Sequence, residues 1–302
     1  MAVFRRLRFL ALLPLVFAAA SCIEFVDDGF DGGPDNTPDA PPDQPVTTLA
    51  TISPLDPDDA CSPAAIGEDD GRILAIERVE DGERGARCFG AEIASVDAAW
   101  ALLESIADPA ARSAIVRLVA FESDGETLAF AGPVDPFDNT AFYIAVDANA
   151  DTSGDEFALT VVHEFAHVLT GGPADLDIET SSFECETWHN GYGCAVDGGV
   201  IDEWVDEFWA DAALDALPVD GQPDLDGGDR RCTLDRSFVG AYAASHPEED
   251  LAETFAVYVL GSEVAPAVDP KLDFFDARPR FAAVRQRAED AGLVAQLDDE
   301  CG

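Results

Sequence analysis

The stretch Asp155-Glu-Phe-Ala-Leu-Thr-Val-Val-His163-Glu164-Phe-Ala-His167-Val-Leu-Thr170 decides how the rest of this chain is organised. Its apolar residues recur at the spacing of one helix face, and Gly171-Gly172-Pro173 follows at once, so we expect a helix over residues 155–170. Residues four apart on a helix share a face, and the imidazoles of His163 and His167 therefore point the same way. Glu164 directly follows His163 and lies on the neighbouring part of the helix surface.

Two imidazoles that face one point favour a Zn²⁺ site, because zinc accepts neutral ring nitrogens and keeps a position open for water. Zinc lowers the pKa of such a water to about 7, and Glu164 would then take its proton as general base. His163 and His167 could instead be ordinary half-buried residues. However, the chain has only four histidines and two of them occupy this spacing, which favours the zinc site.

A catalytic zinc needs a third protein ligand, and the residues leave two carboxylates in competition. Glu253 is flanked by Ala252 and Ala256, whose small side chains would let a second helix approach the first closely. Asp250, three residues earlier, could accept a proton from a ligand imidazole.

The competitor is Glu207 with Asp211, which could equally be the solvated face of a helix. A histidine ligand of the kind found in metzincins is excluded, because Thr170 and Pro173 stand where that class has its glycine and third histidine.

Around the 155–170 helix the pattern predicts an α+β domain. Before it we expect a helix at 97–106 and strands at 115–121, 127–130 and 142–146, which form a small antiparallel or mixed sheet, most simply a meander. After it we expect helices at 201–216, 248–260 and 278–291. The folded domain would span residues 61–302.

The N-terminal region indicates that the protein is exported from the cytoplasm. Residues 1–22 combine a basic start with an apolar run that is too short to span a membrane, followed by Ala19-Ala20-Ser21-Cys22. This resembles the lipobox of bacterial lipoproteins, and simple cleavage after Ala20 is the alternative. Residues 23–60 are rich in Pro and Asp and would form a disordered tether. Without Cys22 six of the seven cysteines remain, enough for three disulfides, with Cys185 and Cys194 placed to close a short loop.

The charge limits the partners that the protein can have. Asp and Glu number 61 against 17 Lys and Arg, a formal net charge of −44. Such a field repels phosphate backbones, so we expect no nucleic-acid partner. We expect a peptide or protein substrate, and a membrane association only through a lipid on Cys22. The location would be the outer membrane, the cell surface, the periplasm or the medium.

The His163-Glu-Phe-Ala-His167 block and the later Tyr242-Ala-Ala-Ser-His-Pro-Glu-Glu-Asp250-Leu-Ala-Glu253-Thr-Phe-Ala block resemble a family of largely uncharacterised bacterial zinc metallopeptidases. The pair of motifs is also similar to the gluzincin arrangement of anthrax lethal factor. The resemblance covers about residues 95–287. It implies a zincin-like fold, Glu253 as the third ligand and a strand beside the cleft, which would be residues 141–146.

Tyr242 also stands in the pattern of that family. A phenol near a catalytic zinc can donate a hydrogen bond to a developing oxyanion, so Tyr242 is a candidate catalytic residue, and a buried packing role is the alternative. His246 could fill the same position, although Ser-His-Pro is typical of a surface turn.

The sequence therefore predicts a zinc metallopeptidase. Two alternatives remain: a surface lipoprotein that keeps the zinc site as a structural or binding element without turnover, and an adhesion or envelope-interaction module.

Overall fold

The computed structural model describes residues 61, 63, 72–123, 127–218, 221–297 and 301. The expected signal peptide (1–22), its candidate lipid site Cys22 and the expected tether (23–60) lie outside the described residues.

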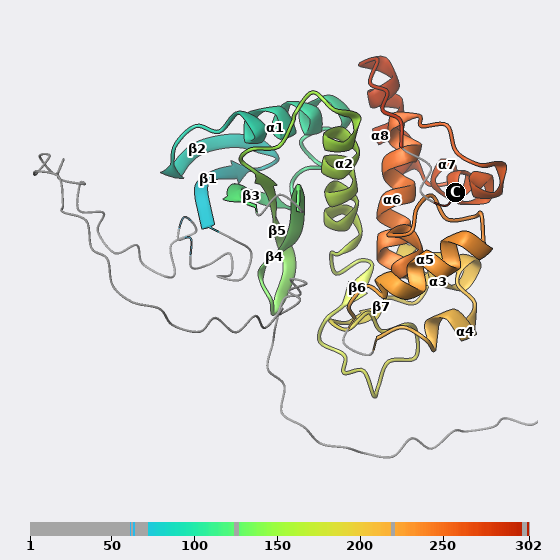
Figure 1. Ribbon diagram of the computed structural model, residues 1–302. Helices are drawn as coiled ribbons and strands as arrows, with labels where there is room; N and C mark the ends of the chain where they lie inside the picture. Colours follow the sequence, from blue (N-terminus) through green and yellow to red (C-terminus); the bar gives the residue numbers. More distant parts are fainter. Residues whose placement is uncertain are drawn as a thin grey trace, which may run out of the picture. The chain divides into compact units, whose positions relative to one another are not determined.

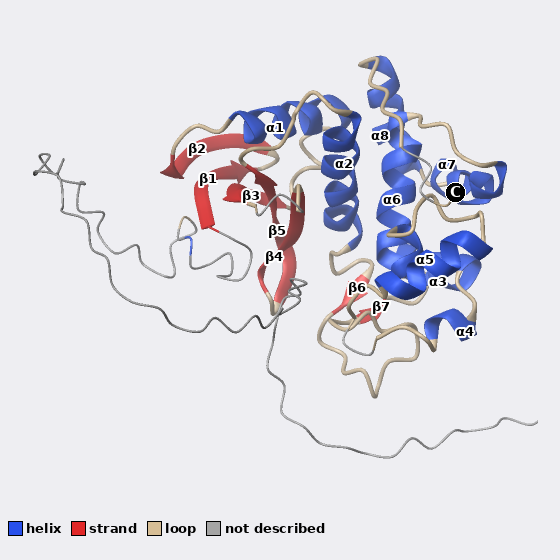
Figure 2. Ribbon diagram, viewed as in Figure 1, coloured by secondary structure: helices blue, strands red, loops and turns tan. Residues whose placement is uncertain are grey.

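A five-stranded mixed sheet forms one half of the described fold (Figures 1 and 2). Its strands are β1 (Arg72–Glu80), β2 (Glu83–Gly90), β3 (Ile115–Glu122), β4 (Ala129–Asp135) and β5 (Asp138–Asp147), in the spatial order β2-β1-β3-β5-β4. The strands β3 and β5 are parallel, and the other neighbours are antiparallel. The predicted meander is therefore wrong, because β4 turns back along β5 as a hairpin and leaves β3 to pair with the far side of β5.

The strand at the open edge beside the helix that carries His163 and His167 is β4. Residues 141–146, which we expected at the cleft, lie in β5 between two partners, and all but Ala141 are buried. Pro133 occupies β4, where the missing N–H is tolerated because one side of an edge strand has no ladder to complete.

The β1–β2 hairpin brings residues 72–90 into the same sheet as the rest of the domain. Its turn is Asp81-Gly82, and both residues have positive φ, 53° and 75°. A two-residue turn needs such φ values to match the right-handed twist of the two strands. A Cβ on Gly82 would lie 1.9 Å from the carbonyl oxygen of Pro109, so only glycine fits there. Because β1 also pairs with β3, this region is an integral part of the sheet.

Two helices, α1 (Ala94–Ile106) and α2 (Asp155–Thr170), share the main hydrophobic core with residues of the sheet. Leu103, Ile144 and Phe165 are fully buried in that core. The bounds of α2 match the helix expected from sequence.

The second half is helical and begins after two short strands, β6 (Leu176–Asp177) and β7 (Cys194–Ala195). Its helices are α3 (Val200–Phe208), α4 (Asp211–Leu214), α5 (Leu225–Leu234), α6 (Pro247–Leu260), α7 (Asp269–Asp276) and α8 (Pro279–Asp290). The single helix expected over 201–216 is interrupted at Trp209, which is extended and directs its indole N–H to Asp250. In Figure 1, α6 stands alongside α2, and residues of the two helices are in close contact.

Three disulfides join the six described cysteines: Cys61–Cys88, Cys185–Cys194 and Cys232–Cys301. The even count expected from sequence is confirmed in these pairs. Within the described ranges, every helix is too short or too polar to cross a membrane.

Candidate metal centre

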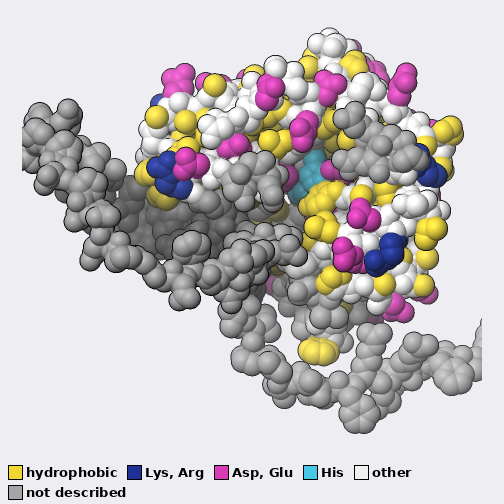
Figure 3. Space-filling model, viewed as in Figure 1, with side chains coloured by type: hydrophobic (Ala, Val, Ile, Leu, Met, Phe, Trp, Pro, Cys, Tyr) yellow, Lys and Arg dark blue, Asp and Glu magenta, His cyan; other side chains and the backbone are white. Residues whose placement is uncertain are grey.

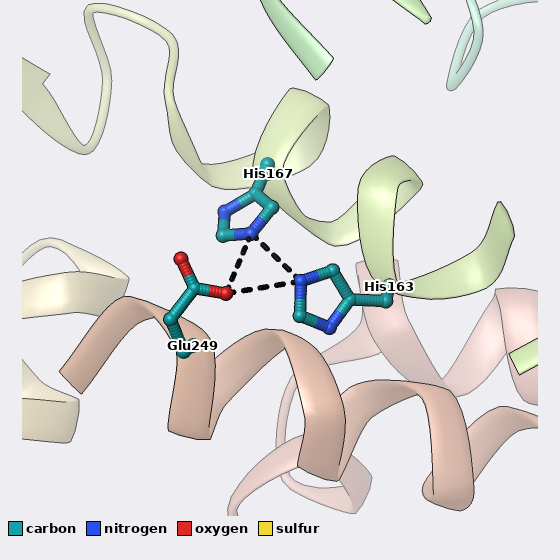
Figure 4. A group of neighbouring side chains, drawn as sticks. All are labelled: His163, His167 and Glu249. Carbon is teal, nitrogen blue, oxygen red and sulfur yellow. Dashed lines mark hydrogen bonds and ion pairs between the residues drawn. The ribbon is translucent and has the colours of Figure 1, made fainter. Parts of the chain in front are cut away.

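The two histidines of α2 present the same ring atom to one point (Figure 4). The Nε2 atoms of His163 and His167 lie 3.0 Å apart. The side chain of His163 is 7% exposed, whereas that of His167 is 24% exposed and lies nearer the solvent. The helical spacing predicted this convergence.

Glu249, in the first turn of α6, completes the group. Its Oε2 atom lies 3.1 Å from Nε2 of His163 and 3.4 Å from Nε2 of His167, and all three atoms lie within 4.8 Å of one another. Two ligands that bind a tetrahedral zinc at about 2 Å lie about 3.3 Å apart, so these separations are those of a shared ion. The set is two imidazoles and one carboxylate, which leaves one coordination position for water.

A buried carboxylate oxygen that has no hydrogen-bond donor also supports a metal ion at this site. Glu249 Oε2 is buried and, despite the short separations, has no donor in hydrogen-bonding geometry. A buried carboxylate oxygen without a donor is costly unless a cation satisfies it. The residues present therefore suit a divalent metal.

Glu253 does not occupy the position that the sequence assigned to it. Its Oε1 atom lies 3.2 Å from Nδ1 of His163, on the opposite side of the ring from Glu249. Both glutamates project from one face of α6, one turn apart. The position of α6 along α2 places Glu249, and not Glu253, next to the two Nε2 atoms. Nδ1 of His163 is buried and has no partner in hydrogen-bonding geometry, and a small rotation of the Glu253 carboxylate would let it accept that proton and keep the lone pair of His163 on Nε2.

Asp250 also differs from expectation, because it faces away from both imidazoles. Its carboxylate accepts hydrogen bonds from the indoles of Trp204 and Trp209, at 3.1 and 3.0 Å, and from Lys271 Nζ at 2.7 and 2.8 Å. Successive residues of a helix diverge by about 100°, so Asp250 cannot share the face of Glu249.

Glu164 is buried beside the two histidines. Burial raises the pKa of its carboxyl group, and the neighbouring imidazoles and the backbone N–H of Ala131 oppose this rise. Ala131 belongs to β4, so the edge strand and the candidate base are in direct contact. A raised pKa brings a carboxylate closer to the range useful for proton transfer at neutral pH.

Tyr242 lies at the same site, just before the short 3₁₀ turn Ala243–Ser245. Its ring centroid is 6.0 Å from that of His163, and its hydroxyl interacts with Glu249. Although 41% of Tyr242 is exposed, the restricted access of water to its hydroxyl and the carboxylates of Glu249 and Glu164 raise the pKa of the phenol, which therefore stays protonated and able to donate.

Without a metal, the carboxylates around the two imidazoles favour their protonated forms. Burial alone would lower the pKa of His163, but the neighbouring carboxylates of Glu249 and Glu253 outweigh it and raise that pKa well above its ordinary value. The pKa of His167 is raised in the same way by Glu249. Burial would raise the pKa of Glu249, yet the two imidazoles hold it well below its usual range.

The other candidates lie elsewhere. Glu207 and Asp211 are exposed and lie outside the group of His163, His167 and Glu249.

His246 is buried, contrary to the expected surface turn. Its Nδ1 accepts the backbone N–H of Glu248 and caps α6, and the ring centroid of Trp188 lies 5.1 Å from that of His246. The sequence prediction missed Glu249, although His-Pro-Glu-Glu marks a capped helix start with acidic residues.

The space-filling view shows histidine side chains at the surface of a recess, with apolar side chains below it and acidic ones nearby (Figure 3). The histidines of the candidate metal centre lie on α2, which contacts α6.

No protein-family model matches the chain, and no curated protein matches it. Among solved structures, it is similar in part to a proposed zinc-binding metallo-peptidase from Bacteroides caccae, with 16% sequence identity and a TM-score of 0.33 over 65% of this chain and 73% of the other. At that score the likeness carries no weight for fold or activity, and the proposed function rests on the site alone.

Proposed function

We propose that this protein is a zinc-dependent peptidase whose metal is held by His163, His167 and Glu249. The observation that carries the proposal is the approach of three ligand atoms from two helices to within coordination distance of one point. This ligand set replaces the one with Glu253 that the sequence favoured.

Zinc, when bound there, would lower the pKa of a bound water and polarise the carbonyl of a substrate. Glu164 would accept the proton of the attacking water and pass it to the leaving amine. Its burial and the contact with Ala131 hold the carboxylate next to the imidazoles and limit its rotation.

Two further residues would serve the reaction without binding the metal. Tyr242 would donate a hydrogen bond to the oxyanion that develops on the substrate, since its hydroxyl already lies at Glu249 and stays protonated. Glu253 would hold His163 in the tautomer that presents Nε2.

The substrate would be a peptide in extended form. The edge of β4 is open among the described strands, and Ala131 on that strand touches Glu164. A peptide added to this edge would gain main-chain hydrogen bonds and pass close to the base.

We also propose that the protein is exported, as its disulfides suggest, and is held at the cell envelope by a lipid on Cys22 if the lipobox is processed. Mass spectrometry of Cys22 in the native host tests the lipid.

Metal analysis of the purified full chain tests the central proposal, with about one zinc per chain expected. Glu164→Gln should keep the zinc and lose cleavage of a peptide library. Wild-type protein without zinc would refute the metal site. Wild-type protein that binds zinc fully and cleaves nothing would instead support the non-catalytic lipoprotein.

A further inference from the structure

The first turn of α6 carries three consecutive acidic residues that point in three directions. Glu249 faces the imidazoles of α2. Glu248 accepts a hydrogen bond of 2.8 Å from the side-chain amide of Asn190, and Asp250 faces the opposite side, where it is fully buried. The direction of Glu249 therefore depends on how its two neighbours are held.

Asp250 accepts more side-chain hydrogen bonds than the other acidic residues described on α6. Lys271 Nζ, on α7, donates to both carboxylate oxygens, and the indoles of Trp204 and Trp209 donate to one of them. The carboxylate thus links α6 to α7, to α3 and to the residue that follows α3.

Lys271 is itself only 1% exposed, and its ammonium group lies 4.1 Å from the ring centroid of Phe238. Burying such an ion pair rarely adds stability compared with apolar residues of the same size, because desolvation offsets the attraction. Its hydrogen bonds, in contrast, fix the directions of the two side chains, which apolar contacts do not.

We infer that Lys271 is a positioning residue of the metal centre. By fixing the Asp250 carboxylate, it sets the rotation of α6 about its axis and thereby the direction of Glu249 toward His163 and His167. A helix rotation of a few degrees would displace the Glu249 carboxylate relative to the Nε2 atoms without changing the fold. This inference rests on the proposed zinc site.

The test compares zinc affinity and stability in the full chain. Lys271→Met removes the ammonium, and Asp250→Asn/Lys271→Met removes the charge pair but leaves an amide oxygen for both indoles. Val284→Ala, a buried substitution on α8, is the control for general loss of stability. Zinc affinity is measured by competition with a chelator, and unfolding by urea titration of the metal-free protein.

We expect the double variant to fold cooperatively and to bind zinc about 10-fold or more weakly, in the range of changes to groups that orient metal ligands. Bound Co²⁺ should also show a visible spectrum shifted from that of the wild type, because its coordination geometry has changed. Val284→Ala should lose stability yet bind zinc as the wild type does.

Lys271→Met should weaken zinc binding as well, and if that variant does not fold, the double variant decides. Unchanged zinc affinity and an unchanged Co²⁺ spectrum in the folded double variant would overturn the inference and leave the zinc site intact. Wild-type protein that binds neither ion would refute the proposed function and this inference together.

Discussion

Glu249 Oε2 lies 3.1 Å from Nε2 of His163, while Glu253, one turn along the same helix, lies 3.2 Å from the other nitrogen of that ring. One imidazole therefore lies between two carboxylates. The first would share a metal with the ring, and the second would fix its proton. Substitutions of the two carboxylates should therefore affect zinc binding differently.

Replacing each glutamate by glutamine should have unequal effects. Glu249→Gln removes a charged ligand and should abolish stoichiometric zinc binding at micromolar metal. Glu253→Gln should retain one zinc per chain with an affinity about 10- to 100-fold lower, because only the orientation of His163 suffers. Chelator competition followed by metal analysis measures both. Loss of zinc from Glu253→Gln alone, with Glu249→Gln unaffected, would restore the ligand set expected from sequence.

Zinc binding should release protons at pH 7. In the metal-free protein, carboxylates raise the pKa of His163 and His167, which favours bound protons that the metal must displace. Zinc affinity should therefore rise as pH increases through these raised pKa values. Without metal, the same charge interactions add stability that is lost as pH rises through the raised pKa of His163.

Calorimetry in two buffers of different ionisation enthalpy counts the protons released. Glu253→Gln, which removes one of the carboxylates that raise the pKa of His163, should release fewer. Equal heats of binding in both buffers would contradict the prediction.

Tyr242→Phe should separate catalysis from metal binding. The phenyl ring keeps the packing beside His163 but removes the donor, so kcat/KM should fall about 10²- to 10³-fold while zinc affinity changes little. The comparison requires a substrate found in the peptide library. A Tyr242→Phe enzyme with unchanged kcat/KM would assign the residue to packing alone.

Gly82→Ala should destabilise the fold strongly. The new Cβ would meet the Pro109 carbonyl oxygen at 1.9 Å, and φ is +75°. Gly292→Ala is the matched control, because φ is +68° there and nothing lies within 4 Å. We expect a loss of about 1 kcal/mol at Gly292, from the left-handed backbone alone, and of at least about 3 kcal/mol at Gly82. Urea unfolding with the disulfides intact measures both, and equal losses would count against the close approach of Pro109 to this turn.

Local patterns predicted the elements nearest the chemistry. The helix at 155–170, the convergence of His163 and His167, and the even number of cysteines left for disulfides all follow from short-range rules of spacing and parity. The β1–β2 hairpin was missed although Asp81-Gly82 is a strong turn signal, because the strands that flank it carry many charged residues and alternate poorly.

By itself the sequence determined a helix with two histidines on one face and a second helix rich in carboxylates. Only the tertiary structure decided which carboxylate meets the histidines, because Glu249 and Glu253 share a face of α6 and differ only by one turn along its axis. That axial position depends on contacts between elements distant in sequence, above all those of α6 with α2. Likewise, β4 rather than β5 forms the edge beside Glu164, since strand order depends on long-range pairing that no local pattern encodes.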